Sequence, residues 1–243
     1  INQLNNDSIK YYKNQQNIGT TRSRIVGINK ATCQYISFLD DDDFWFPDKL
    51  NKQLVKIKKH CCDFVMCDYL VNNLIDNNQY KKNISSYCED FLFNIIRAPG
   101  PFLQSCLFQK NFLLKHIACF DPHSEPSEDW DFFISISKLN PKIKHINEYL
   151  FQWNLSKKSQ SSVYKNETLA VEYIIKKHYQ YILQNSSGKN VSLLYQRLAS
   201  MFFYIKDFDS SCRYFKKSIL LNPLSVKSLF LKLLFFLPES IRI

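Results

Sequence analysis

A run of four aspartates, residues 40–43, constrains the fold of this chain more than any other feature. The segment directly before it, residues 35–39, is apolar on both faces apart from one serine. Strands that are apolar on both faces are typical of parallel or mixed sheets covered by helices. The aspartates are therefore expected at the carboxyl end of a buried strand, which is where open α/β sheets bind their ligands.

The residues that follow this run continue the pattern of an α/β domain. Residues 64–66 are again apolar on both faces, and a helix is expected between the two strands over residues 46–59. In that helix Leu50, Leu54 and Ile57 form one apolar stripe. A strand, a helix and a second strand in this order predict a βαβ unit.

Further strands and helices extend this pattern to about residue 162. A polar, asparagine-rich loop is expected over residues 72–86, and Ser127 is expected as the N-cap of a helix. Residues 1–162 are thus predicted to form one α/β domain. Its remaining elements are predicted as strands over residues 102–108 and 142–153 and as helices over residues 87–96, 110–117 and 128–139.

The rest of the chain, residues 163–243, is predicted to be helical, with a break at residues 185–190. Several residues there recur at a characteristic spacing: Tyr195, Leu198, Ala199, Phe202, Ser211, Phe215, Ser218 and Pro223. This spacing resembles that of one tetratricopeptide repeat, over residues 192–225. Such repeats are stable alone only in stacks of about three. The helix pair is therefore expected to pack on the preceding domain or on a partner.

Charge and cysteine content narrow the functional class. The 32 Lys and Arg residues outnumber the 22 Asp and Glu residues, and the net charge of +10 favours polyanionic partners or an anionic membrane surface. The eight cysteines have no repeating spacing, which is typical of reduced thiols in a cytoplasmic protein. No apolar run reaches the roughly 18 to 20 residues needed to span a bilayer.

Two chemical interpretations of the aspartate run can be compared. Acidic residues before a helix stabilise its positive end by about 0.3 to 1 kcal/mol each, which accounts for one or two aspartates. Four adjacent carboxylates repel one another unless a cation neutralises them. Carboxylates suit Mg²⁺ or Mn²⁺, which also bind the oxygens of a substrate diphosphate. The run lacks the alternation and the central glycine of an EF-hand loop.

Two blocks of sequence, residues 17–53 and 106–133, carry a closer resemblance. The second block ends in the acidic pair Glu128 and Asp129. In this order and at this separation, the blocks resemble the inverting glycosyltransferases of family two, over roughly residues 2–162. The resemblance implies a GT-A fold, a Rossmann-like mixed sheet flanked by helices, followed here by a helical extension. The matching positions in the first block are Asn17, Gly19, Arg24, Gly27, Ile28, Ala31, Tyr35, Phe38, Leu39, Asp40, Asp42, Asp43, Pro47 and Leu50.

The resemblance also implies a role for each acidic residue. Asp40 and Asp42 would form the DxD motif, with Asp42 the direct ligand of Mn²⁺ or Mg²⁺ and Asp41 or Asp43 in support. The ion would bridge the phosphates of a nucleotide-sugar donor, near which Arg24 would lie. Asp129 would be the general base toward a hydroxyl of a glycan or lipid-linked acceptor, and Glu128 would hold or tune it. Without the first block, helix-end stabilisation would be the simpler explanation of Glu128 and Asp129.

Some positions depart from the family pattern. Ser23 and Ile25 flank Arg24 where the family has alanine and asparagine, Cys33 replaces a common glycine, and Asn154 stands where histidine is frequent. The chain begins with Ile1, and the family's first strands are expected to precede it. A fragment of this kind is expected to bind nucleotide weakly or to fold poorly.

Alternative functions remain open on the sequence alone. The chain could be a non-catalytic scaffold that binds a partner through its helical region, and a scaffold would not need Asp40, Asp42 and Asp129 to converge. Nucleic-acid binding rests on charge alone and is not expected, because the aromatic and basic interleaving of a stacking platform is missing. For the enzyme, the basic charge predicts a cytoplasmic location with peripheral contact at the inner face of the plasma membrane.

Overall fold

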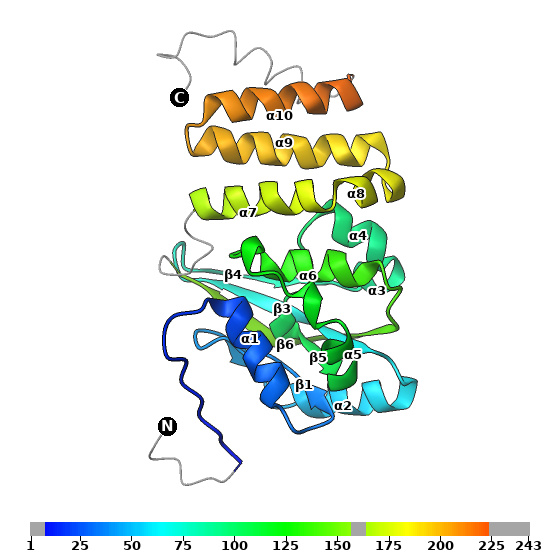
Figure 1. Ribbon diagram of the computed structural model, residues 1–243. Coiled ribbons are helices and arrows are strands. Elements are labelled where there is room, and N and C mark those ends of the chain that lie inside the picture. Colours follow the sequence, from blue (N-terminus) through cyan, green and yellow to red (C-terminus); the bar gives the residue numbers. More distant parts are fainter. Residues whose placement is uncertain (1–7, 157–163, 224–243) are drawn as a thin grey trace.

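The computed structural model describes residues 8–156 and 164–223. An α/β region lies at one end of the molecule and a stack of helices at the other, with helix α6 beside the junction (Figure 1). The expected mixed sheet flanked by helices, followed by a helical extension, is confirmed.

One mixed sheet of six strands forms the centre of the α/β region, in the order β1-β5-β3-β6-β2, with β4 beside β3. The central pair β3 and β6 is parallel, and the other neighbours are antiparallel. The first residues of β3 are buried, which explains their apolar character. The strands are β1 (Tyr35–Ile36), β2 (Phe44–Trp45), β3 (Phe64–Asn73), β4 (Asn78–Lys82), β5 (Cys106–Gln109) and β6 (Ile143–Leu155).

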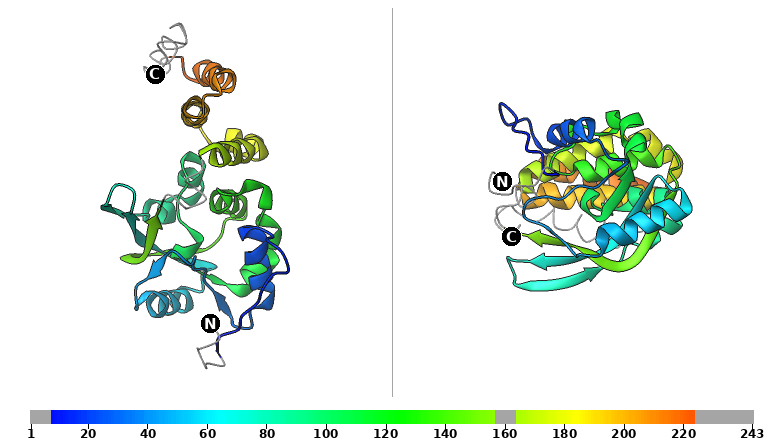
Figure 2. Two further views of the ribbon diagram at one scale, coloured as in Figure 1. Left: turned by 90° about the vertical axis from the view of Figure 1, so that its left-hand side faces the viewer. Right: turned by 90° about the horizontal axis from the view of Figure 1, so that it is seen from below.

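Helices cover both faces of this sheet (Figure 2). Helix α2 lies on one face, and α1, α5 and α6 lie on the other. Phenylalanine rings of β3, β5 and α6 pack together in the core. The helices of this region are α1 (Thr20–Lys30), α2 (Lys49–His60), α3 (Ser86–Glu89), α4 (Phe91–Arg97), α5 (Lys110–Lys115) and α6 (Glu128–Ser137), with single 3-10 turns at Leu103–Ser105, Ile117–Cys119 and Pro122–Ser124.

Helix α2 faces the sheet differently from the predicted stripe. The prediction was wrong for Leu50, which is 44% exposed, whereas Lys49 and Gln53 are fully buried beside Ile57. The Lys49 ammonium donates to Ser37 Oγ at 3.1 Å and to Gln53 Oε1 at 3.0 Å. Because these bonds satisfy the buried polar groups, the helix can turn two polar side chains inward.

Several other elements also differ in extent from their prediction. The loop predicted over residues 72–86 contains strand β4, which pairs with β3 although its side chains are exposed. The helix predicted over residues 87–96 is two helices, α3 and α4. Ser127 does precede α6, but its side chain makes no capping hydrogen bond. The strand predicted over residues 35–39 is shorter, because β1 ends at Ile36 and Leu39 is 47% exposed. Strand β5 lies between β1 and β3, so the two strands of the predicted βαβ unit are not neighbours. The other predicted strands and helices of the α/β region are present with shifted ends.

The helical region consists, in the part that the structure describes, of α7 (Tyr164–Lys177), α8 (Tyr179–Asn185), α9 (Gly188–Tyr204) and α10 (Phe208–Leu221). Helix α9 packs on α10, on α7 and on α4 of the α/β region. The predicted packing of the helix pair on the preceding domain is therefore observed. Seven of the eight residues at the repeat spacing are buried. The eighth, Pro223, is exposed and lies just after the end of α10. The repeat assignment itself stays a prediction.

A group of polar and charged side chains joins α6 to α7, here called the α6–α7 cluster: Asp121, Asp131, Lys177 and His178. Asp131 and His178 are buried, whereas Lys177 reaches the surface. Burial lowers the pKa of His178, although Asp131 opposes the shift. Lys177 Nζ donates to Asp131 Oδ2 at 2.7 Å and to Asp121 Oδ2 at 2.8 Å. His178 Nε2 lies 2.6 Å from Asp131 Oδ1. The two regions are thus held together by ion pairs and hydrogen bonds as well as by apolar contacts.

Three further expectations concern the domain boundary, membrane-spanning helices and the cysteines. The predicted domain boundary at residue 162 falls in residues 157–163, which are not described. Within residues 8–156 and 164–223, no helix has the length and apolar character needed to cross a membrane. All eight cysteines lie in these ranges as free thiols.

Candidate active site

Helix α1 is positioned by its first turn so that Arg24 points into the α/β region. Gly19, with φ of +82°, precedes the helix, and a Cβ there would lie 2.8 Å from Glu125 Oε2. Glycine is therefore favoured both by backbone conformation and by space. Glu125 Oε1 accepts a hydrogen bond from the main-chain N–H of Thr21 at 2.7 Å. These contacts fix the start of α1, and Arg24, one turn along, is only 8% exposed.

The Arg24 guanidinium joins carboxylates from two distant parts of the chain. Nη2 donates to the Asp40 oxygens at 3.1 and 3.2 Å. Nη1 donates to Glu128 Oε1 at 2.8 Å and to Asp129 Oδ1 at 3.1 Å. Asp40 follows β1, and the other two carboxylates lie in the first turn of α6. These four residues are called the Arg24 cluster below.

The charges in the Arg24 cluster are unbalanced, with three carboxylates around one guanidinium. Burial favours the neutral forms and raises the pKa of Glu128 and of Asp129, although Arg24 opposes the shift in both. Burial also works to lower the pKa of Arg24, but the three carboxylates outweigh it and raise that pKa. Arg24 therefore stays charged, and Glu128 and Asp129 hold a proton more readily than exposed carboxyls do.

One main-chain group and one side-chain group of the turn Leu103–Ser105 also donate hydrogen bonds to carboxylates of the cluster. The Leu103 N–H donates to Asp129 Oδ2 at 2.9 Å. The Gln104 side-chain Nε2 donates to Asp40 Oδ2. Gln104 Oε1 and Glu128 Oε2 are both buried, and neither has a hydrogen-bond partner among the described residues. Unsatisfied buried polar atoms are uncommon in folded proteins and often occur at functional sites.

The other three aspartates of the run lie at the rim. Asp41 and Asp42 are exposed. Asp43 Oδ1 accepts from the Asn154 N–H at 2.9 Å, and Asn154 Nδ2 donates to the main-chain carbonyl of Asp42 at 2.6 Å. Burial, opposed by the Asn154 bond but reinforced by Asp42 and Asp40, raises the pKa of Asp43 to about 7. Burial and the neighbours Asp40 and Asp41 likewise raise the pKa of Asp42, against a bond from its own main chain.

The structure thus brings together some, not all, of the predicted site residues. Arg24, Asp40, Glu128 and Asp129 are in direct contact. Asp42 and Asp43 lie beside them, held by Asn154 of β6. Arg24, predicted near the donor, has its guanidinium occupied by carboxylates.

A divalent ion is compatible with this donor set but is not enclosed by it. Within residues 8–156 and 164–223, no three His, Cys, Asp or Glu side chains are close enough to form a metal site alone. Mg²⁺ and Mn²⁺ at diphosphate sites use few protein carboxylates and complete their shells with phosphate oxygens and water. Asp42 is exposed, and its carboxyl is the one best available for this role.

Sequence analysis missed two residues of the site. Gln104 fell within a predicted apolar strand, and its polarity there was the signal that was overlooked. Glu125 drew no attention because its contact, the first turn of α1, is 104 residues away along the chain. Asn154 was noted as a departure from the family pattern, and the structure places it against the aspartate run.

Comparison with known sequences agrees with this geometry. Residues 1–112 match the family described as Glycosyl transferase family 2. The matched segment contains Arg24 and all four aspartates of the run.

The alignments with some relatives cover more of this chain than residues 1–112. The uncharacterized glycosyltransferase MJ1057 of Methanocaldococcus jannaschii is 26% identical over 182 residues, which cover 70% of this chain and 61% of the relative. The uncharacterized glycosyltransferase YwdF of Bacillus subtilis is 27% identical over 128 residues, 51% of this chain and 46% of the relative. The chain thus spans about half the length of these two relatives. A crystal structure of S. aureus TarS 1-349 in complex with UDP-GlcNAc aligns with 83% of this chain and 72% of that chain, at 14% identity and a TM-score of 0.49.

Proposed function

We propose that this protein transfers a sugar from a nucleotide-diphosphate donor to a hydroxyl group of a glycan or lipid-linked acceptor, with inversion at the anomeric carbon. The observation that carries the proposal is the meeting of Asp40 and Asp129 on one guanidinium. These residues come from segments far apart in sequence, since Asp129 lies 105 residues from Arg24. A scaffold function has no need for such a meeting.

Asp129 is the proposed general base. Its carboxylate is positioned by Arg24 on one oxygen and by the Leu103 N–H on the other, and each oxygen retains a further lone pair. Burial raises its pKa, which makes it a stronger base than an exposed aspartate. In the proposed step Asp129 accepts the proton of the acceptor hydroxyl. The hydroxyl oxygen bonds to the anomeric carbon while the bond from that carbon to the nucleoside diphosphate breaks.

Glu128 and Arg24 are proposed to tune this base. Both α6 carboxylates share Nη1 of Arg24, so a change in the charge of one alters the hold on the other. Burial and the charge of Asp129 raise the pKa of Glu128, so that Glu128 holds a proton more readily than an exposed glutamate does. The guanidinium thereby keeps two acidic side chains adjacent without a second cation.

The proposed cofactor is Mn²⁺ or Mg²⁺, held by Asp42 and Asp40 with Asp41 or Asp43 in support. When bound, such an ion neutralises charge on a departing diphosphate. The aspartate run concentrates negative charge at the rim, and the charges of Asp42 and Asp40 add to the effect of burial in raising the pKa of Asp43. A cation there would relieve this repulsion.

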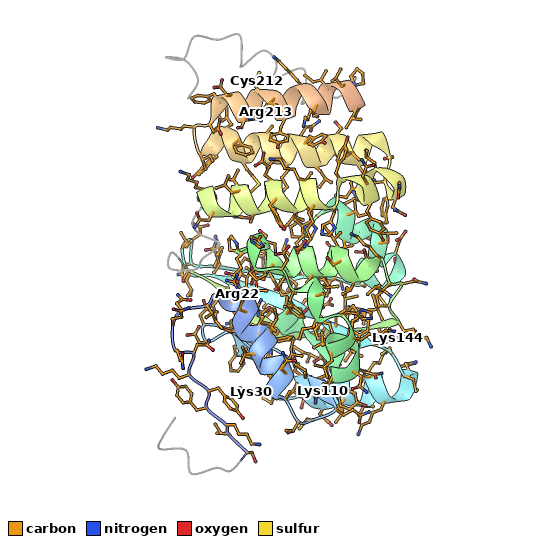
Figure 3. The ribbon with its side chains drawn as sticks, in the orientation of Figure 1. Arg22, Lys30, Lys110, Lys144, Cys212 and Arg213 are labelled. Atoms are coloured by element: carbon orange, nitrogen blue, oxygen red, sulfur yellow. The ribbon has the colours of Figure 1, made fainter. Side chains whose placement is uncertain are left out.

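We further propose peripheral contact with the inner face of the plasma membrane, where a lipid-linked acceptor would reside. The basic residues Arg22, Lys30, Lys110 and Lys144 come from three elements of the α/β region (Figure 3). Each basic residue placed near an anionic surface contributes about 1 kcal/mol. The full-length protein should float with anionic liposomes at low salt, and protein that stays in the dense fraction would remove this part of the proposal.

The decisive experiment for the reaction is a survey of nucleotide-sugar turnover by the full-length protein, with Mn²⁺, with Mg²⁺ and with a chelator. We expect turnover of one donor that needs the metal and is lost in Asp42→Asn and Asp129→Asn. Asp76→Asn, a change in the exposed turn between β3 and β4, is the matched control and should retain full turnover. Absence of turnover and of metal-dependent nucleotide binding would favour the scaffold.

A further inference from the structure

Lys49, the first residue of α2, is a fully buried lysine that the proposed chemistry does not use. Its amine donates to Ser37 Oγ at 3.1 Å and to Gln53 Oε1 at 3.0 Å, and it lies 4.2 Å from the centroid of the Trp45 ring. In the part of the chain that the structure describes, no carboxylate lies within 4.0 Å of it. Burial lowers the pKa of Lys49 to about 8, so the group is mostly an ammonium at neutral pH. A buried ammonium without a carboxylate is costly, and its contacts are therefore expected to have a use.

The three side chains that meet at Lys49 all donate to one short stretch of main chain, the carbonyls of three consecutive residues. The bonds join Trp45 Nε1 to the carbonyl of Gln104 at 3.1 Å, Gln53 Nε2 to that of Ser105 at 2.8 Å, and the Ser37 hydroxyl to that of Cys106. The first two carbonyls belong to the turn Leu103–Ser105, and the third belongs to the first residue of β5. Lys49 is therefore a common point of support for this turn.

The charge of Lys49 sets the direction of two of these bonds, because an ammonium can only donate hydrogen bonds. The Ser37 oxygen accepts from it, which leaves the hydroxyl proton for the Cys106 carbonyl. In the same way the side-chain oxygen of Gln53 faces Lys49, and its NH₂ group faces the Ser105 carbonyl. Without the ammonium, neither side chain is held in the orientation that supports the turn.

The same turn holds carboxylates of the Arg24 cluster. The Leu103 N–H donates to Asp129 Oδ2 at 2.9 Å, and the Gln104 side chain donates to Asp40 Oδ2. Asp129 Oδ1 is bonded to Arg24, so the Leu103 N–H fixes the second oxygen and with it the plane of the carboxylate. A displacement of about 1 Å in such a group can cost about 10²-fold in rate.

We propose that Lys49 is a positioning residue, which fixes the turn Leu103–Ser105 and thereby the orientation of Asp129. The inference rests on the proposed function, in which Asp129 is the general base. Lys49 itself does not touch the substrate. Asp42, the proposed metal ligand, is held by Asn154 and not by this turn. The loss of Lys49 should therefore slow the chemical step and leave donor binding nearly unchanged.

Amide hydrogen exchange of the full-length protein, followed by mass spectrometry, tests the hold on the turn without turnover. In Lys49→Met the exchange of residues 103–106 should accelerate at least tenfold more than that of residues 132–136, which lie inside α6. Lys58→Met, the same substitution at an exposed position of α2, should leave the exchange of both segments unchanged. Equal acceleration of the two segments in Lys49→Met, or none, would overturn the inference.

Turnover of the donor tests the link from Lys49 to Asp129. In Lys49→Met the kcat should fall by about tenfold or more, while the KM for the donor changes by less than about threefold. Added to Asp129→Asn, Lys49→Met should lower the residual kcat by less than about twofold, because the carboxylate through which Lys49 acts is gone. A purely structural role would lower kcat by the same factor in both backgrounds, and that result would overturn the inference.

A second variant keeps the inference testable if Lys49→Met does not fold. Trp45→Phe retains an aromatic ring beside Lys49 but removes the N–H that binds the Gln104 carbonyl. It should give the same pattern of exchange and kinetics with a smaller fall in kcat, of about threefold, and unchanged exchange at residues 103–106 would contradict the inference. Absence of turnover by the unchanged protein would instead count against the proposed function, and the exchange result would still decide whether Lys49 holds the turn.

Discussion

Helix α6 contributes to two acidic clusters that differ in how completely their α6 carboxylates are hydrogen-bonded. Asp129 belongs to the Arg24 cluster, where three carboxylates share one guanidinium. Asp131, two residues further, belongs to the α6–α7 cluster, where two carboxylates meet Lys177, His178 and the Tyr173 hydroxyl. The first cluster has excess negative charge, and one of its buried carboxylate oxygens has no hydrogen-bond partner in the part of the chain that the structure describes. Both oxygens of Asp131 are bonded.

The direction of the pKa shifts follows this difference. In the Arg24 cluster burial dominates and raises the pKa of both α6 carboxyls. In the α6–α7 cluster burial also acts on Asp121, but bonds from Lys177, from the His123 N–H and from Tyr173 outweigh it and lower that pKa. Matched charges contribute to structure, whereas unmatched ones persist where a ligand or a proton is exchanged. The comparison therefore assigns chemistry to Asp129 and attachment of the helical region to Asp131, although both lie in the first turn of α6.

The largest expected effect comes from removing the only cation of the Arg24 cluster. Arg24→Met should lower the free energy of unfolding by about 4 kcal/mol at neutral pH, because it leaves three partly buried carboxylates without compensation. Urea denaturation measures this loss. Arg22→Met, at an exposed position on the same helix, should change stability by less than about 0.5 kcal/mol. Adding Glu128→Gln to Arg24→Met should recover part of the loss, and no recovery would contradict the repulsion argument.

A somewhat smaller loss of folding stability is expected for a change in the α6–α7 cluster. Asp131→Asn should lower the free energy of unfolding by about 3 kcal/mol, because Lys177 and His178 lose their buried partner. Asp129→Asn should change it by less than about 1 kcal/mol, since lost hydrogen bonds are offset by reduced repulsion. Chemical denaturation of both variants checks the contrast. Equal losses would mean that the two clusters do not differ as described.

The pH dependence of stability should have opposite signs for the two clusters. The pKa of Glu128 is raised above its ordinary 4.5, so its folded form binds the proton more tightly and its contribution to stability falls as the pH rises above 4.5. The pKa of Asp121 is lowered from 3.8, so its contribution is present above pH 3.8 and is lost as the pH falls below that value.

Unfolding measured from pH 2 to pH 8 tests these signs. Glu128→Gln should flatten the decline above pH 4.5, and Asp121→Asn should flatten the loss below pH 3.8. A Glu128→Gln profile that parallels that of the unchanged protein would show that Glu128 ionises as an ordinary carboxyl in the folded state.

The smallest effect is expected for Gln104, whose amide oxygen has no hydrogen-bond partner among the described residues. Gln104→Met removes one hydrogen bond to Asp40 but also removes the buried, unsatisfied Oε1, so stability should change by less than about 1 kcal/mol. Gln53→Met is the matched comparison. Gln53 donates to two main-chain carbonyls and accepts from buried Lys49, and its loss should cost about 2 to 3 kcal/mol. Thermal unfolding resolves this difference.

Local signals in the sequence predicted the elements of the α/β region, and the family resemblance predicted which carboxylates lie together. Buried strands were visible because both faces of β3 are apolar. The orientation of α2 was not predictable, because buried Lys49 depends on Ser37 and Trp45, which lie outside the helix. The strand β4 was hidden by its exposed, polar side chains.

The same limit applies to the candidate site. Periodicity describes which face of an element is buried, but it carries no information on the contact between Gln104 and Asp40 or between Glu125 and Gly19. The α6–α7 cluster also depends on pairing across two regions. Asp131 was indistinguishable in sequence from the acidic residues beside it, and only its partners separate its role from that of Asp129.

The central claim is that Asp129, and not the whole acidic end of α6, performs the chemistry. The most direct test is donor turnover by the full-length proteins carrying Asp129→Asn and Asp131→Asn, at a temperature at which urea denaturation shows both to be folded. The account predicts that turnover falls by about 10²- to 10⁴-fold in Asp129→Asn and by less than about threefold in Asp131→Asn. Similar turnover in the two variants would contradict it.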